Sequence, residues 1–269
     1  MQRTKTVKDS MGELQVDESV LFGAQTQRAV ENFPVSGRKM PEKFVRALLQ
    51  IKKNTAQANK TLGCVDESTA DSIISACEQL LGSNTLMSNF PVDVFQTGSG
   101  TSSNMNANEV IAAIASNLSG SSIHPNDHVN FGQSSNDVIP TAIHVSARIA
   151  VEDDLKPALL HLIQTIEGKA KSVAGVCKTG RTHLMDAMPI SFDQTLLGWV
   201  CQLESTLSLL ESTSMSLQSL ALGGTAVGTG INTHPEFAST FAKILSAELG
   251  INFSPGDSFF ALMGAQDPS

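Results

Sequence analysis

The sequence has few aromatic side chains and few cysteines. It contains no tyrosine, one tryptophan and 12 phenylalanines among 269 residues. Its cysteines are far apart and form no CxxC pair, which argues against a disulfide framework and against a zinc site. We therefore expect reduced thiols packed as small hydrophobic side chains at all four positions, Cys64, Cys77, Cys177 and Cys201.

Long apolar runs and an excess of basic residues are also missing. No segment approaches the roughly 18 consecutive apolar residues of a membrane span, and the first residues lack the apolar core of a signal peptide. Lys and Arg number 18 against 26 Asp and Glu, a net charge of −8 that is unfavourable for binding a phosphate backbone. We expect a cytoplasmic protein that binds neither membranes nor nucleic acids.

Alanine, leucine and serine fill the long segments, and strand-like alternation is scarce, so the pattern predicts a mainly all-α fold. Residues 1–40 contain several glycine and proline breaks and are predicted to be irregular. We place helices at residues 41–63, 67–81 and 104–117, another after residue 136, and one between residues 233 and 250. No helix is predicted beyond residue 250.

Two segments carry apolar residues in alternating steps of three and four, the spacing of one helix face. The positions are Leu155, Leu159, Leu162, Ile166 and Val173, then Leu196, Val200, Leu203, Leu207, Leu210 and Leu217. Asp154 and Ser191 are the expected N-caps. A helix over residues 191–221 would span roughly 45 Å, which favours an elongated bundle completed by other subunits. The alternative is ordinary core helices within a monomer.

Two polar segments precede predicted helices and are rich in hydrogen-bond donors. Residues 96–106 combine two glycines with several hydroxyls, which favours anion binding at a helix start, although the lysine of a phosphate-binding P-loop is absent. Residues 133–137 place hydroxyls and an amide where a substrate carboxylate would be stabilised. Taken alone, the first could be a simple loop and the second a simple N-cap.

Histidines mark two further segments. His124 and His128 lie four residues apart, but Pro125 makes a helical pairing unfavourable there and no third ligand is evident, so we predict no metal site. Residues 178–187 place His183 in a polar stretch between two predicted helices, where an imidazole can act as acid or base near neutral pH.

Together and in this order, the motifs resemble the fumarase/aspartase superfamily and, within it, the class II fumarate hydratases. The similar segments are residues 11–13, 22–34, 98–108, 124–130, 134–142, 180–189 and 223–230. Gly-Arg-Thr-His at residues 180–183 is similar to fumarases, whereas aspartases typically carry Gln in the position of His183. Gly224 favours a fumarase in the same way.

The resemblance implies a small N-terminal domain over residues 1–135, part of a long central helical bundle over residues 136–269, and a C-terminal domain absent from this sequence. It implies a homotetramer whose active sites combine segments of three subunits. The implied reaction is reversible addition of water to fumarate, giving (S)-malate, without metal or cofactor. A mitochondrial location is possible if the source is eukaryotic.

The resemblance also assigns roles to individual residues. His183 is the implied catalytic residue that helps to activate water. The implied contacts to substrate are Ser99, Gly100, Thr101, Ser134, Ser135, Asn136 and Thr182. A second dicarboxylate site near the surface is implied for His124, Pro125, Asn126 and Asp127.

One family motif has no counterpart in this sequence: the loop Gly-Ser-Ser-x-Met-Pro-x-Lys-x-Asn, which carries the serine taken as the catalytic base. We therefore expect a fragment that is inactive by itself. Two alternatives stay open, an aspartate ammonia-lyase and a non-catalytic helical protein that uses the anion sites for binding or assembly.

Overall fold

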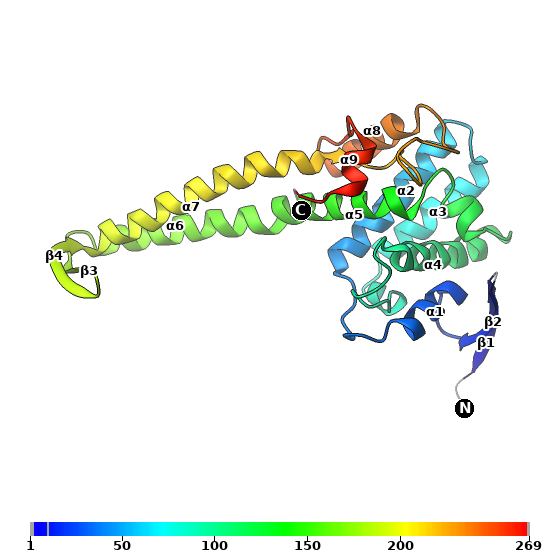
Figure 1. Cartoon of the computed structure of the whole chain (residues 1–269), viewed down its shortest axis with the longest axis horizontal. Helices are drawn as coiled ribbons and strands as arrows, with labels where there is room; N and C mark the ends of the chain where they lie inside the picture. Colours follow the sequence, from blue (N-terminus) through cyan, green and yellow to red (C-terminus); the bar gives the residue numbers. More distant parts are fainter. Residues whose placement is uncertain (1–2, 10, 268–269) are drawn as a thin grey trace. The chain divides into compact units, whose positions relative to one another are not determined.

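The computed structural model describes residues 3–9 and 11–267, and it confirms a mainly helical protein (Figure 1). The contacts divide the chain into two compact units. Unit 1 comprises residues 1–147 together with 218–267, and unit 2 comprises residues 148–217. The predicted domain boundary at residues 135 and 136 stays a prediction.

Unit 1 contains most of the elements. Its helices are α1 (Ala24–Asn32), α2 (Glu42–Thr61), α3 (Glu67–Leu81), α4 (Thr101–Ser119), α8 (Phe237–Leu249), α9 (Phe259–Gly264) and the start of α5 (Ser135–Ala150). Short turns lie at Leu86–Asn89 (3-10) and Pro125–Val129 (π). Its strands form an antiparallel hairpin of β1 (Thr4–Asp9) and β2 (Gly12–Asp17), and a short parallel pair of β5 (Ser219–Leu220) and β6 (Ser254–Pro255).

The core of unit 1 forms where α2 packs against α3 and α8, and where α3 packs against α4 (Figure 1). α2 buries Leu48, Leu49 and Ile51 completely or nearly so. Phe237 and Phe241 of α8 are fully buried, with ring centroids 6.4 Å apart. Burying such side chains removes apolar surface from water and is the main stabilising term of the unit.

Unit 2 is a pair of helices joined by a strand hairpin (Figure 1). A π-helical turn (Val151–Leu155) leads into α6 (Lys156–Ser172), followed by β3 (Cys177–Thr182), β4 (Met185–Ser191) and α7 (Phe192–Ser214). A 3-10 turn, Met215–Gln218, follows α7. α6 packs against α7, yet Leu162, Leu197 and Trp199 stay exposed on the pair. Unit 2 therefore presents apolar surface that its own two helices do not cover.

Several helix predictions are confirmed, and the residues at their ends explain why. α3 begins after Asp66, whose carboxylate accepts the backbone N–H of Thr69 at 3.0 Å. Ser191 caps α7 in a capping box with Gln194. α8 ends at Gly250, which takes the left-handed conformation typical of glycine in that place.

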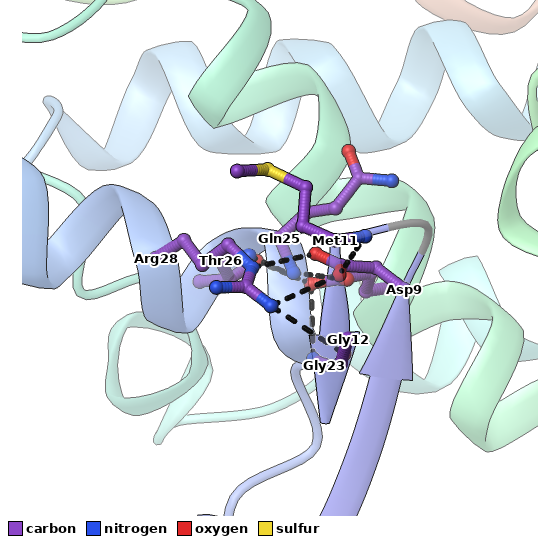
Figure 2. A network of polar contacts seen from close by, with 8 residues as sticks. Asp9, Met11, Gly12, Gly23, Gln25, Thr26 and Arg28 are labelled. Carbon is purple, nitrogen blue, oxygen red and sulfur yellow. Dashed lines mark hydrogen bonds and ion pairs between the residues drawn. The ribbon is translucent and has the colours of Figure 1, made fainter. Parts of the chain in front are cut away.

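The prediction that residues 1–40 are irregular is wrong, because distant residues stabilise this segment. Glu109 of α4 accepts hydrogen bonds from the backbone N–H groups of Gly23, Gln25 and Thr26, so the N-terminus of α1 is capped by a carboxylate more than 80 residues away. Arg28 then donates to Asp9 at 2.9 Å and ties α1 to the hairpin (Figure 2). Neither partner is visible from the local sequence.

Other boundaries also differ from prediction. Asp154 is no N-cap, because the chain passes through the π-helical turn into α6 without a break. α7 ends at Ser214, which gives about 35 Å rather than 45 Å. α4 begins at Thr101 rather than Asn104, and α9 forms beyond residue 250. The hairpin of β3 and β4 was not expected, because its strands lack a regular alternation of apolar and polar residues.

The thiol prediction is confirmed in part. All four cysteines are free. Cys77 is buried as expected, but Cys177 and Cys201 are exposed, because both lie in unit 2, where few side chains cover them. None of the described helices combines the length and the apolarity that a membrane crossing requires.

Candidate functional site

The start of α4 carries the first predicted group of binding residues. Gly100 is its N-cap and takes a left-handed backbone conformation with a φ of 67°. The hydroxyls of Ser99 and Thr101 lie 2.8 Å apart, on either side of this glycine. A Cβ at Gly100 would lie 2.9 Å from the side chain of Ile139, so only glycine lets α4 begin this close to α5.

The start of α5 carries the second group, and Asp137 holds it in place. The buried carboxylate of Asp137 accepts the backbone N–H of Ser134 at 2.9 Å. Its second oxygen accepts the N–H groups of Gly223 and Thr225, at 3.1 and 2.8 Å. Burial raises the pKa of Asp137 to about 6, although these backbone hydrogen bonds and the charge of Lys52 lower it. Asp137 thus connects the start of α5 to residues 223–225.

Ser134, Ser135 and Asn136 each have a defined partner. The backbone N–H of Asn136 donates to Ser134 Oγ at 3.2 Å, and Asn136 Nδ2 donates to the carbonyl of Ala226 at 2.8 Å. Ser135 Oγ accepts from Asn104 Nδ2 at 3.0 Å. Both serine oxygens already accept a hydrogen bond, so each hydroxyl proton can be donated to a ligand.

A cavity of about 440 Å³ brings two of the predicted binding residues together. Ser99 and Asn136 line it with Gly98, and apolar side chains, among them Ile139 and Phe260, form much of the rest of the lining. A few polar donors among apolar side chains are typical of a site that fixes the orientation of a small acid. The backbone N–H groups at the start of α5 add a favourable potential for an anion.

The segment with His124 and His128 folds as a π-helical turn. His124 is its N-cap, and its Nδ1 accepts the backbone N–H groups of Asn126 and Asp127 at 3.3 and 3.2 Å. The backbone N–H of His124 donates to His128 Nδ1 at 2.9 Å, so the contact joins the backbone of one histidine to the ring of the other and does not pair the two imidazoles. Pro125 is tolerated because it occupies the first position of the turn.

This turn lies beside another hollow in unit 1, of about 360 Å³. Asn126 and Asp127 line it together with Ser134. The structure therefore brings part of the predicted second site close to the start of α5. Among the described residues, no group of three or more His, Cys, Asp or Glu side chains is arranged to hold a metal ion.

Thr182 and His183 belong to unit 2, where they end β3 and begin the hairpin turn. His183 and Leu184 both take left-handed φ values, of 51° and 62°. Their side chains are exposed, and Leu184 is 98% exposed. The tight turn therefore presents the imidazole to the surroundings of the hairpin.

Sequence reasoning did not single out Lys52 or Asp137, although a signal for each was present. Lys52 follows Leu48 by four residues on the buried face of α2, a position where a charged side chain is unusual. Asp137 stands in the first turn of α5, where a carboxylate can accept backbone N–H groups. Both are buried and both interact with the segment that carries Ser134 and Ser135.

Comparison with known proteins gives a consistent result. The profile described as Lyase matches residues 12–266. A class II fumarate hydratase of Pseudomonas aeruginosa is 56% identical over 267 residues, covering 99% of this chain and 58% of that protein. The class II fumarate hydratase of Halobacterium salinarum is 52% identical, covering 98% of this chain and 57% of its own length.

Solved structures agree. A class II fumarase from Schistosoma mansoni superposes with a TM-score of 0.94 at 37% identity, covering 99% of this chain and 60% of that one. A protein from Brucella melitensis titled fumarate lyase:delta crystallin gives 0.91 at 39% identity, covering 97% of this chain and 58% of that one. The chain spans less than two thirds of the length of these relatives.

Proposed function

The chain belongs to the Lyase family, and we propose that the protein carrying it reversibly adds water to fumarate to give (S)-malate. The observation that carries this proposal is the cavity at which Ser99 and Asn136 meet, at the starts of α4 and α5. The names of the relatives support the same reaction, since those cited are class II fumarate hydratases.

The chemistry of hydration fits these residue types. Removing a proton beside a carboxylate of malate produces an aci-carboxylate with added negative charge on its oxygens. Preorganised hydroxyl, amide and backbone N–H donors stabilise that charge. We assign binding of the substrate carboxylates to Ser99, Gly100 and Thr101 at α4, and to Ser134, Ser135 and Asn136 at α5.

The hairpin of unit 2 supplies the remaining proposed contacts. We assign substrate binding to Thr182 and activation of water to His183. Elimination across the carbon–carbon bond needs an acid and a base on opposite faces, and an exposed imidazole at the tip of a hairpin can serve one of them. We further propose a homotetramer in which segments of three subunits meet at each site. The uncovered apolar surface of α6 and α7 supports assembly.

The hollow beside the π-helical turn is the proposed second dicarboxylate site. His124 caps the turn that Pro125, Asn126 and Asp127 begin, and the side chains of His124 and Asp127 are exposed and lie 3.1 Å apart. We infer that the protein works in the cytoplasm, which agrees with bacterial and archaeal relatives. We keep residues 1–135 and 136–269 as the proposed domain division.

The test uses the protein that carries this chain, purified and mixed with fumarate, with loss of ultraviolet absorbance followed over time. Fumarate should be consumed and malate should accumulate, and His183→Asn should lower turnover by about 100-fold. His161→Asn, an exposed histidine on α6, serves as the matched control and should leave turnover unchanged.

Two other results would overturn the proposal. Ammonia release from aspartate without fumarate hydration would identify an aspartate ammonia-lyase. Tight binding of fumarate with no turnover in either reaction would identify a non-catalytic binding protein. A monodisperse monomer in light scattering would contradict the proposed tetramer.

A further inference from the structure

Lys52 of α2 is a fully buried lysine whose amine contacts only polar atoms of one loop. Its Nζ donates to Asn130 Oδ1 at 2.8 Å and to Gln133 Oε1 at 3.0 Å. A lysine ammonium has donors and no acceptor, so both amides must turn their oxygen atoms toward it. Burial lowers the pKa of Lys52 to about 7, and the charge of Asp137 raises it. A neutral amine still has two N–H groups, the number these contacts require.

The orientation of the Asn130 amide in turn fixes the orientation of two neighbouring amides. Asn130 Oδ1 also lies 3.2 Å from Asn104 Nδ2 and 3.2 Å from Asn108 Nδ2, both from α4. Because Asn130 presents oxygen, these two amides must present their NH₂ groups. Asn104 Nδ2 donates in addition to Ser135 Oγ at 3.0 Å.

As a result, the hydroxyl of Ser135 has a defined role as acceptor from Asn104 and donor to another group. Its oxygen is occupied as an acceptor by Asn104, so its single hydrogen remains available for another acceptor. If the amide of Asn104 were reversed, the hydroxyl would donate to Asn104 instead and would be lost to a ligand. Asn130 Nδ2 also donates to the carbonyl of Gln133 at 3.2 Å, so Lys52 acts together with this carbonyl to fix the direction of Asn130 and, three side chains away, what Ser135 can do.

We propose that Lys52 is a positioning residue that directs a chain of hydrogen bonds through Asn130 and Asn104, so that Ser135 donates its hydroxyl to a substrate carboxylate. This inference rests on the proposed function, which places Ser135 at the carboxylate. Lys52 itself does not touch the substrate. It affects substrate binding by setting which groups donate and which accept in a buried network of hydrogen bonds.

The kinetic test uses Lys52→Met in the protein that carries this chain, with Lys53→Met as matched control. Lys53 is the next residue of α2 but pairs with Glu78 and Glu248, away from the network. Losing one donor to a charged carboxylate should raise KM for fumarate about tenfold, with kcat within about threefold of wild type. Lys53→Met should change neither.

A double-mutant cycle with Ser135→Ala separates positioning from general damage. In the Ser135→Ala background, Lys52→Met should raise KM no further, because the hydroxyl it directs is gone. An equal rise of KM in both backgrounds would overturn the proposal. A fall in kcat at unchanged KM would do so too, because it indicates a loss of folded protein.

Two further measurements keep the test decisive. If Lys52→Met does not fold, Asn104→Ala breaks the same chain nearer to Ser135 and should give the same Ser135-dependent rise of KM. Neutron diffraction structures of Lys52→Met and Lys53→Met without ligand locate hydrogen atoms and provide a readout that needs no activity. The hydrogen between Asn104 and Ser135 should move from the amide nitrogen to the serine oxygen only in Lys52→Met, and an unchanged position would contradict the proposal.

If the wild-type protein does not turn over fumarate, the proposed function fails. The ligand-free structures would still decide whether Lys52 directs the network, so the two failures remain distinguishable.

Discussion

The starts of α4 and α5 in unit 1 and the hairpin of unit 2 hold their polar residues in opposite ways. At α5, Ser134 and Ser135 are held by buried partners, Asp137 and Asn104. At the hairpin, His183 and Leu184 are exposed and held by backbone geometry alone. The first region is preorganised by its own unit, whereas the second exposes its side chains. Substitution of the buried partners in the first region should therefore lower stability, whereas substitution of the exposed side chains in the second should not.

The largest loss of stability is expected for Asp137→Ala in the first region. It removes a carboxylate that accepts three backbone N–H groups, from Ser134, Gly223 and Thr225, and leaves them buried without partners. We expect the free energy of unfolding to fall by about 3 kcal/mol in denaturant titration. Asp257→Ala, an exposed residue of the same unit, is the control and should change little. A loss below about 1 kcal/mol for Asp137→Ala would contradict the buried role.

The second largest loss of stability is expected for Gly100→Ala at the start of α4. The added methyl group would lie 2.9 Å from Ile139, on a backbone with a left-handed φ of 67°. Crowding and backbone strain should together lower the free energy of unfolding by about 2 kcal/mol. Gly98→Ala, where nothing lies within 4 Å, should be almost neutral. Ile139→Ala combined with Gly100→Ala should cost less than the sum of the two single changes; additive losses would argue against the contact.

A third prediction concerns how the stability contributed by Asp137 depends on pH. The pKa of Asp137 is raised from 3.8 to about 6 by burial, so between these values the folded state binds more protons than the unfolded state. Its contribution to stability is present below pH 3.8 and is lost as pH rises through 6, by about 3 kcal/mol.

The difference in unfolding free energy between wild type and Asp137→Asn, measured from pH 4 to 7, isolates this contribution. It should decrease as pH rises. A flat difference would show that Asp137 titrates alike in both states. Lys52 affects stability at higher pH. Because its pKa is lowered from 10.5 to about 7, the free energy of unfolding should rise as pH increases between these two values.

The smallest expected effect on stability is that of His183→Asn. Asparagine tolerates the left-handed conformation of residue 183, and the imidazole is exposed, so the unfolding free energy should change by less than about 0.5 kcal/mol. Thermal unfolding followed by circular dichroism checks this. A loss of several kcal/mol would mean that the hairpin depends on the imidazole, and the contrast with α5 would not hold.

The sequence predicts the features that depend on nearby residues better than those that depend on distant ones. Local signals located α3 at its observed bounds, because Asp66 caps it and its apolar residues follow the helical period. For Ser99, Asn136 and His183, motifs whose meaning came from a family resemblance supplied roles that stay predictions. Local signals missed α1, whose N-terminus is capped by Glu109 from far along the chain.

Long-range pairing also explains the other omissions. Lys52 lies on a helix that local periodicity predicts well, but its partners Asn130 and Gln133 are about 80 positions away. The hairpin of β3 and β4 lacks apolar alternation, and its tight pairing depends on Gly180, where a Cβ would lie 2.6 Å from the carbonyl of Met188. Such contacts are set by tertiary structure, and no single segment encodes them.

We propose that both regions meet one dicarboxylate, and a crystal structure of the assembled protein with bound malate would decide this. We expect malate at Ser99 and Asn136 of one subunit, with His183 of another within hydrogen-bond distance of the ligand or of a water beside it. Malate bound at that cavity with every His183 far from it would rule the proposal out.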